Sequence, residues 1–182
     1  MTLFGLIVLL VISMLIAHIS LQPGQFRISR SAIINAPAHD IYVQVNDLQK
    51  WEQWSPWARL DPNATTSYDG SPLGVGQSFS WKGNKQIGVG KMSISESSPD
   101  ERIRIKLDFT KPMRASNDVQ FDFRALNDDQ TEVTWAMSGD NEFMGKAMNL
   151  VMNMDRMVGG QYEQGLANLK ALVEGQKKIG AA

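Results

Sequence analysis

The sequence of 182 residues contains no cysteine and only two histidines, His18 and His39. Without cysteine the chain forms no disulfide, carries no thiolate nucleophile and offers no sulfur ligand to a metal. A site built from histidines is poorly supported as well, because catalytic and structural zinc centres commonly use two or three of them. We therefore expect no metal and no cofactor.

The chain also lacks a charge excess of either sign. Its formal net charge is -1, and lysine and arginine are scattered along the sequence. Proteins that bind nucleic acid gather basic side chains into a patch or stripe that neutralises phosphates. No such stripe is present in the sequence, so we expect no nucleic-acid partner.

Charge is absent altogether from residues 3 to 21, LFGLIVLLVISMLIAHISL. A helix of about 20 residues, rising about 1.5 Å per residue, crosses a hydrocarbon core of about 30 Å. We predict that residues 1–22 form an uncleaved, single-pass transmembrane anchor. A cleaved signal peptide is the alternative, but it would need a basic start and a small-residue exit, and Ala17-His18-Ile19-Ser20 is a poor one.

The side of the membrane is weakly specified. Arg27 and Arg30 follow the apolar segment, and nothing basic precedes it. The positive-inside rule then places the globular part in the cytoplasm. Two arginines make a small margin, so the opposite side stays open.

The rest of the chain is predicted to form one domain. Gln22-Pro23-Gly24-Gln25 is a short polar break, and we assign residues 23–25 to a linker, 26–174 to the domain and 175–182 to a flexible tail. FRISRSAII, residues 26 to 34, is rich in β-branched residues and predicts a strand. Asn35-Ala36-Pro37 then opens a helix.

From Thr65 to Ser138 the apolar residues recur with a period of two. Ile103, Ile105 and Leu107, for example, alternate with basic residues. This pattern is typical of antiparallel strands with one buried and one wet face. The parity slips between Ile87 and Ile94, which predicts a β-bulge or sharp bend near Gly88 and Gly90.

The last predicted element is a long helix from Phe143 to Val173, with apolar residues on one stripe at a period near 3.6. A sheet with one apolar face needs cover, and this helix is the only element long enough to supply it. The predicted fold is α+β: a curved antiparallel sheet of about six to seven strands wrapped around a long C-terminal helix. A ligand could lie between the two.

Three of the five tryptophans, Trp51, Trp54 and Trp57, lie in KWEQWSPWARL, residues 50 to 60. Trp51 and Trp54 share a helix face, and Pro56 turns the chain so that Trp57 approaches from another direction. About 30 residues separate them from the apolar segment, which argues against a membrane belt. We interpret the cluster first as the plug at one end of the core, and second as a wall that a ligand contacts.

Three stretches in this order resemble the SRPBCC superfamily, the START-like, helix-grip group, in its polyketide cyclase/dehydrase and lipid-transport branch. They are Ile34-Asn35-Ala36-Pro37, Trp51-Glu52-Gln53-Trp54-Ser55-Pro56-Trp57, and Met154 to Gly160 with Gly165 to Lys170. The resemblance covers roughly residues 26 to 174. It implies a helix-grip fold with a deep hydrophobic cavity between sheet and helix. Its relatives bind lipids, sterols, hormones or polyketide intermediates, and a few catalyse cyclisation or dehydration.

The function expected from the fold and the resemblance is binding of a hydrophobic small molecule, lipid-like or polyketide-like, by a membrane-anchored domain. The first alternative is an enzyme of the cyclase/dehydrase type that uses a cavity carboxylate. The second is a protein-interaction module with a filled core. We expect binding rather than catalysis, and the resemblance carries over no catalytic residue.

Asp155 is the polar residue of most interest, because helical geometry places it near the centre of the apolar stripe. A carboxylate that faces a cavity would have a raised pKa and could act as an acid. The structural alternative is a bond to a tryptophan N–H or a pair with an arginine. The residues predicted to line the cavity are Trp51, Trp54, Trp57, Trp81, Phe109, Phe121, Trp135, Met137, Met148, Val151 and Asp155.

Overall fold

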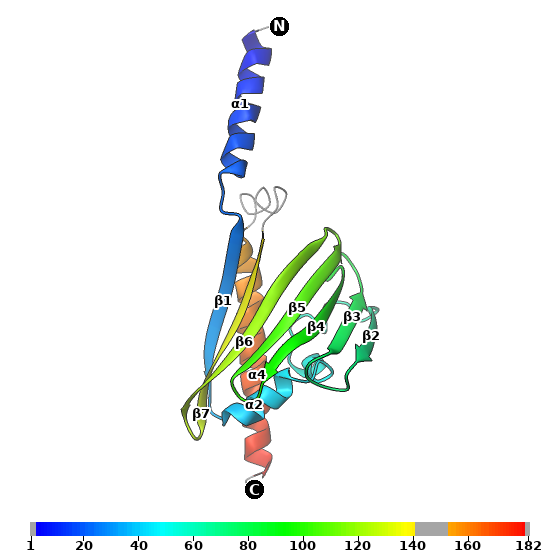
Figure 1. The fold of residues 1–182 in the computed structure, drawn as a ribbon, viewed down its shortest axis with the longest axis vertical. Helices are drawn as coiled ribbons and strands as arrows, with labels where there is room; N and C mark the ends of the chain where they lie inside the picture. Colours follow the sequence, from blue (N-terminus) through cyan, green and yellow to red (C-terminus); the bar gives the residue numbers. More distant parts are fainter. Residues whose placement is uncertain (1–2, 141–152, 181–182) are drawn as a thin grey trace.

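A computed structural model describes residues 3–140 and 153–180 of the chain. Figure 1 shows one curved sheet with a long helix against it and an N-terminal helix that stands apart. The architecture confirms the predicted α+β fold, in which an antiparallel sheet grips the C-terminal helix.

Seven strands form a single antiparallel sheet in the order β1-β7-β6-β5-β4-β3-β2. From β2 to β7 each strand pairs with the next one in sequence, and β1 pairs with the last. Alternation puts apolar residues on the face toward the helices and charged residues on the other. The strands are β1 Gln25–Ile34, β2 Thr65–Gly70, β3 Gln77–Lys82, β4 Val89–Ser98, β5 Arg102–Lys111, β6 Ala115–Asn127 and β7 Gln130–Asp140.

The irregularity predicted near Gly88 and Gly90 is confirmed. The register of β4 with β5 shifts between Val89 and Gly90, and Gly88 has a φ of 66°. A positive φ at this position favours glycine, since a side chain would strain the backbone. A second shift, which the sequence pattern did not predict, lies between Ile94 and Glu96 and makes Ser95 the extra residue.

Three helical elements accompany the sheet. Helix α2 spans Ala38–Val45, the 3-10 turn η1 spans Lys50–Gln53 and helix α4 spans Met154–Gly180. Residues 175–180 therefore continue α4, although a flexible tail was predicted there. The first part of the predicted C-terminal helix, up to residue 152, lies outside the described residues.

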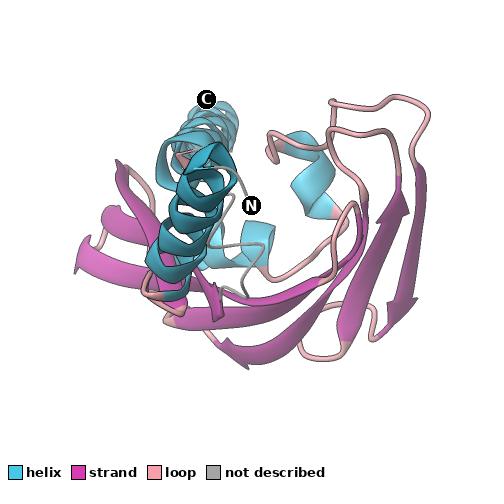
Figure 2. Cartoon of the chain, turned by 90° about the horizontal axis from the view of Figure 1, so that it is seen from above, coloured by secondary structure: helices cyan, strands magenta, loops and turns pink. Residues whose placement is uncertain are grey.

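Helix α4 covers only one side of the concave face. Viewed from above in Figure 2, it lies over one side of the curved sheet, and α2 and η1 lie beyond it. The contacts of α4 with the sheet are to β1 and, fewer, to β7. Glycines allow the close approach: Gly165 packs on the ring of Trp135, and Gly159 packs on the guanidinium of Arg30.

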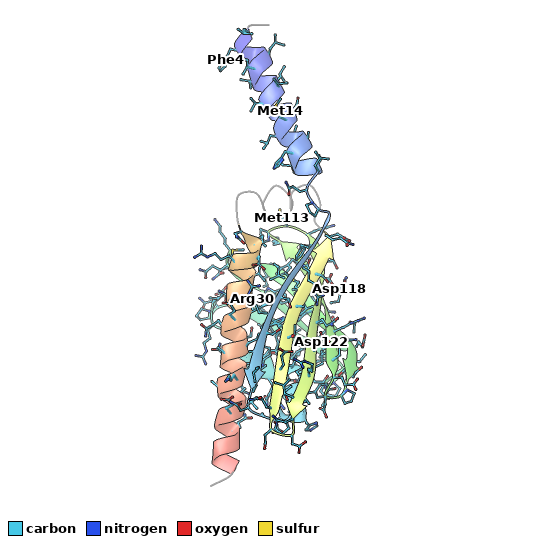
Figure 3. All side chains as sticks on the ribbon, turned by 90° about the vertical axis from the view of Figure 1, so that its left-hand side faces the viewer. Phe4, Met14, Arg30, Met113, Asp118 and Asp122 are labelled. Carbon is cyan, nitrogen blue, oxygen red and sulfur yellow. The ribbon has the colours of Figure 1, made fainter. Side chains whose placement is uncertain are left out.

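Helix α1, Leu3–Ser20, is long and apolar enough to cross a membrane. Figure 3 shows it extending from one end of the domain, with Phe4 and Met14 on its surface. Nearly all of its side chains are exposed, as they would be if lipid rather than protein surrounded them. A signal sequence near the N-terminus would have the same length and composition.

The sheet has two distinct ends. Residues Leu21–Gly24 join α1 to the start of β1, where Gln25 pairs with Asp140. Because neighbouring strands are antiparallel, the β5–β6 and β3–β4 turns lie at the same end of the sheet as the start of β1. We call this the anchor end, and we call the end with the β4–β5 and β6–β7 turns the far end.

We predict opposite effects for two substitutions in α4. A Cβ at Gly165 would come within 2.7 Å of the Trp135 ring, whereas a Cβ at Gly160 would meet no atom within 4 Å. Gly165→Ala should therefore destabilise the domain by about 1–3 kcal/mol, because overpacking displaces α4. Gly160→Ala should stabilise it by roughly 0.5–1 kcal/mol through helix propensity.

Urea denaturation followed by tryptophan fluorescence measures both free energies of unfolding. If both variants were stabilised equally, α4 would not be packed against Trp135 as described.

Candidate functional site

The aromatic side chains under α4 form a filled core. Trp51, Trp54, Phe121, Trp135 and Tyr162 are each less than 7% exposed, and their rings lie 4.1 to 6.2 Å apart between centroids. We call these five residues the core aromatic cluster. Burying one tryptophan removes roughly 200 Å² from water, about 5 kcal/mol as an upper estimate.

Two of the three clustered tryptophans, Trp51 and Trp54, are buried in the core. Trp51 donates its indole N–H to the carbonyl of Val45 at 2.9 Å, and Trp54 donates to Gln44 at 3.3 Å. Both indoles are buried with their one donor satisfied, so they offer a ligand neither open surface nor a hydrogen bond. Trp57 is half-buried and meets Trp135 and Tyr162 edge to face.

Trp135 and Tyr162 carry the unusual polar groups of this core. Their rings stack 4.1 Å apart at an angle of 11°. Among the described residues, Trp135 Nε1 is the one buried side-chain nitrogen or oxygen without a hydrogen-bond partner. Burial raises the pKa of Tyr162, so its hydroxyl stays neutral at any physiological pH. An unpaired buried donor costs about 1–3 kcal/mol, which a water or a ligand oxygen could offset.

A second aromatic group lies on the part of the concave face that α4 leaves uncovered. Tyr68, Phe79, Trp81 and Phe109 follow one another across β2, β3 and β5, with centroids 4.9, 5.9 and 5.6 Å apart. We call these four residues the aromatic ladder. All are partly exposed, Tyr68 by 41%. Met92 and Leu107, also half-buried, lie between the ladder and the core.

Gly90 of β4 lets the ladder continue from β3 to β5. It pairs with Trp81 on one side and Phe109 on the other, and it has no side chain to separate their rings. A Cβ there would collide with the Trp81 indole. Trp81 also donates its N–H to the carbonyl of Ile87 at 2.9 Å. The ring is thus held in place with its donor occupied, and it presents an apolar surface.

The residues predicted to line a cavity are divided between these groups. Trp81 and Phe109 belong to the ladder. Trp51, Trp54, Phe121, Trp135 and Met137 are buried in the core, and Trp57 lies at its border. Met148 and Val151 lie outside the described residues. Tyr68, Phe79, Met92 and Leu107 were not predicted, although their strand parity could have placed them beside Trp81 and Phe109.

Asp155 does not face a cavity. Its side chain is 62% exposed and pairs with Arg30, whose Nη2 lies 2.9 Å from Oδ2, while Arg30 Nε lies 2.7 Å from Glu163 Oε1. The hydrogen bonds from Arg30 lower the pKa of Asp155. The prediction of a cavity carboxylate with a raised pKa is therefore wrong, and the alternative of a pair with an arginine is confirmed.

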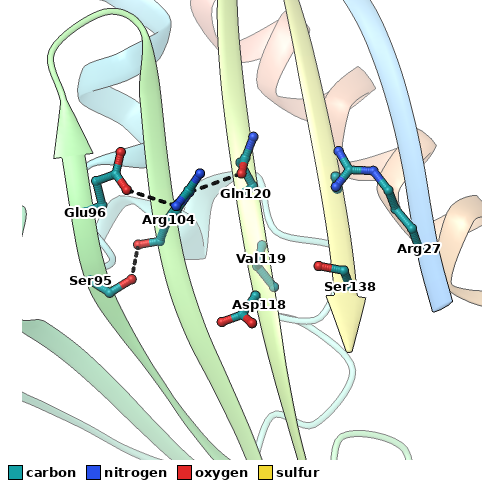
Figure 4. Close-up of a pocket in the computed structure, with 9 residues that line it drawn as sticks. Arg27, Ser95, Glu96, Arg104, Asp118, Val119, Gln120 and Ser138 are labelled. Carbon is teal, nitrogen blue, oxygen red and sulfur yellow. Dashed lines mark hydrogen bonds and ion pairs between the residues drawn. The ribbon is translucent and has the colours of Figure 1, made fainter. Parts of the chain in front are cut away.

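The opposite face of the sheet carries a polar depression of about 460 Å³, shown in Figure 4. Its charged groups largely pair with their neighbours: Arg104 lies 3.3 Å from Glu96, and Asp118 lies 3.1 Å from Lys106. Arg104 also donates to Gln120 at 3.2 Å. We therefore place the candidate ligand site on the concave face rather than here. No group of three or more His, Asp or Glu side chains in the described part of the chain could hold a metal ion.

Comparison with known proteins agrees with this geometry. The model for the family "Polyketide cyclase / dehydrase and lipid transport" matches residues 25–174. A structural-genomics protein from Chromobacterium violaceum superposes with a TM-score of 0.56 at 17% identity, covering 84% of this chain and 99% of the other. An aromatase/cyclase from a Streptomyces species gives 0.60 at 10% identity, covering 82% and 94%.

A Staphylococcus aureus protein of unknown function gives a TM-score of 0.63 at 10% identity, covering 85% of this chain and 96% of the other. At such identities the likeness concerns the fold alone. The search of curated proteins gives no match.

The Arg30–Asp155 pair predicts a pH-dependent difference in stability. Because the pKa of Asp155 in the folded state lies below the unfolded value of about 3.9, its stabilisation is present above that pH and is lost as pH falls through the folded-state pKa. Asp155→Asn should therefore lower the thermal midpoint at pH 7, modestly because the pair is exposed. The difference from the wild type should narrow as pH falls below the unfolded-state pKa of about 3.9 and through the lower folded-state pKa.

Thermal unfolding followed by circular dichroism at pH 7, 5 and 3 measures this difference. Asp128→Asn, on the β6–β7 turn, is the control, since Asp128 makes no ion pair with any described residue. A constant deficit for Asp155→Asn across this pH range would contradict the prediction.

Proposed function

The chain belongs to the polyketide cyclase/dehydrase and lipid-transport family, and from this premise we propose that it is a membrane-anchored protein that binds a hydrophobic small molecule on the concave face of its sheet. The molecule is lipid-like or polyketide-like and lies against the aromatic ladder, beside α4. Helix α1 holds the domain at the bilayer.

The observation that carries the proposal is the partial exposure of the ladder. Four aromatic rings in contact, with Met92 and Leu107 beside them, make an apolar surface on a concave face. The rings of the core aromatic cluster, by contrast, are buried and in contact with one another. Each Å² of ladder surface removed from water would contribute about 25 cal/mol, part of which offsets the freedom that the ligand loses on binding.

The chemistry of the ladder supports an apolar ligand. Trp81 has its donor occupied by Ile87, and Phe79 and Phe109 have no polar atom. Tyr68 alone brings a hydroxyl, whose pKa is raised by burial and by the charges of Glu52 and Asp47. That hydroxyl is protonated at neutral pH and can donate to a ligand oxygen at the edge of the ladder.

The enzymatic alternative is less well supported. A cyclase or dehydrase needs an acid or base at the reacting atoms. Asp155, the carboxylate considered for this role, is exposed and held ionised by Arg30. Some fold neighbours carry the name aromatase/cyclase, but their identity to this chain is 10–11%, and no catalytic residue is transferred from them.

We predict that a photoactivatable diazirine fatty acid will cross-link to the ladder strands of the full-length protein in lipid nanodiscs. Trp81→Ala and Phe109→Ala should each lower this cross-linking about tenfold, as expected for a loss of roughly 1.5 kcal/mol of apolar contact. Peptide mass spectrometry locates the labelled residues on β3, β5 or elsewhere.

Ile33→Ala is the matched control. Ile33 is 46% exposed, and strand parity puts it on the outer face of β1, away from the ladder. The control should cross-link at the ladder like the wild type. Cross-links confined to α1 would refute ligand binding and favour the alternative of an interaction module with a filled core.

A further inference from the structure

We propose that the two turns at the anchor end, β3–β4 and β5–β6, form a docking surface for an anionic phospholipid bilayer. The inference rests on the proposed function insofar as α1 must lie in that bilayer. It adds the orientation of the domain: the ladder would open toward the lipid from which the ligand comes.

The register of the sheet places both turns beside the start of β1. Asn117 pairs with Gly139 and Phe109 with Ala115, so the β5–β6 turn lies next to the end of β7. Lys82 pairs with Val89, which brings the β3–β4 turn to the same end. Figure 3 shows Met113, in the β5–β6 turn, at the end of the domain from which α1 extends.

The two turns themselves carry charges of one sign, although the carboxylates of Asp61 and Asp140 also lie at this end. Residues 82–91 and 109–117 contain five basic residues and no acidic one: Lys82, Lys85, Lys91, Lys111 and Arg114. None of the five forms an ion pair with a described residue, in contrast to Arg102, Arg104 and Lys106 in the middle of the sheet. Unpaired lysines and arginines are attracted to anionic lipid.

The two turns at the far end carry the opposite charge. Its β4–β5 turn carries Asp100 and Glu101, and its β6–β7 turn carries Asp128 and Asp129. The basic turns and the acidic turns thus lie at opposite ends of the strands, although the net charge of the chain is only -1. A membrane surface of negative potential would attract the basic turns and repel the acidic turns. The strands would then lie roughly perpendicular to the membrane plane.

An apolar side chain lies among the basic ones. Met113 is 37% exposed, and Lys111 and Arg114 flank it in the tip of the β5–β6 turn. Basic side chains around an apolar one suit the headgroup region, where the cations meet phosphates and the apolar group enters the acyl boundary. This combination favours a lipid surface over an acidic protein, which would need no such residue.

The linker keeps the surface within reach. Only Leu21–Gly24 separate α1 from β1, and four residues span at most about 14 Å. Charges act over a Debye length of about 8–10 Å at physiological salt. A domain tied this closely to the bilayer brings its basic turns into the range of the surface potential without a further binding step.

Docking in this orientation gives the ladder a route from the lipid. Trp81 precedes the β3–β4 turn by one residue, and Phe109 lies two residues before Lys111 and four before Met113. Trp81 and Phe109, the ladder residues nearest the anchor end, are therefore adjacent to the docking surface. An apolar ligand would move from the acyl region to Trp81 and Phe109 while the turns exclude bulk water.

Single-cysteine labelling tests the inference, because the chain contains no cysteine of its own. Met113→Cys, labelled with the environment-sensitive fluorophore NBD, is measured in the full-length protein in nanodiscs of 30% phosphatidylserine or of phosphatidylcholine alone. We expect a blue-shifted emission and quenching by doxyl-labelled lipid in the anionic discs, and a loss of both at high salt. Asp128→Cys at the far end should show neither.

Removing two anchor-end charges provides the matched comparison. Lys111→Gln/Arg114→Gln should lower the ratio of docked to undocked domain about 25-fold, at about fivefold per charge. Lys177→Gln/Lys178→Gln, near the C-terminal end of α4, removes the same charge at the other end and should change nothing. Equal NBD emission at position 113 in both kinds of disc would overturn the inference.

The outcomes also separate this inference from the proposed function. Fatty-acid cross-linking at the ladder without lipid contact at position 113 would overturn docking and leave ligand binding intact. Lipid contact at position 113 without ladder cross-linking would support docking and refute ligand binding at the ladder. Protection of position 113 that occurs only when a second protein is added would identify the surface as a protein interface and refute docking on lipid.

Discussion

The stacking of Tyr162 on Trp135 determines where the long helix lies, and the rest of the molecule depends on that position. The two rings are 4.1 Å apart, and Gly165, one helical turn further, lets the helix backbone approach the same indole. Arg30 fixes the start of the helix through Asp155 and Glu163. These contacts hold α4 over β1 and β7, so it cannot also cover β2 to β5.

This asymmetric cover divides one apolar face into two regions that differ in exposure. Under the helix, aromatic rings bury one another and fill the space, which stabilises the domain but leaves a ligand little to contact. Beyond the helix, similar rings stay partly exposed because nothing among the described residues covers them fully. A partly exposed aromatic surface on a concave sheet is costly for a soluble domain, and binding an apolar molecule would relieve that cost.

Strand parity is the property of this chain that makes most of the sheet predictable from its sequence. The alternation of Ile103, Ile105 and Leu107 identified the buried face, and the slip of parity located the bulge at Gly88 and Gly90, because both are local properties of the chain. The family resemblance from residue 26 to 174 agrees with the matched range of 25–174. Asp155 was predicted to face a cavity because helical periodicity places it near the apolar side of the helix. Periodicity contains no information about Arg30, which lies 125 residues earlier on β1 and pairs with Asp155 in the structure.

The sequence by itself determined the order of the elements, the face that each strand buries, the family and an apolar segment long enough to span a membrane, since these follow from composition, periodicity and local motifs. The tertiary structure alone decided which aromatic residues fill the core and which remain partly exposed. Trp54 and Trp81 are the same residue type, yet one lies beneath α4 and the other beyond it. Their difference arises from non-local packing, which no pattern along the chain records.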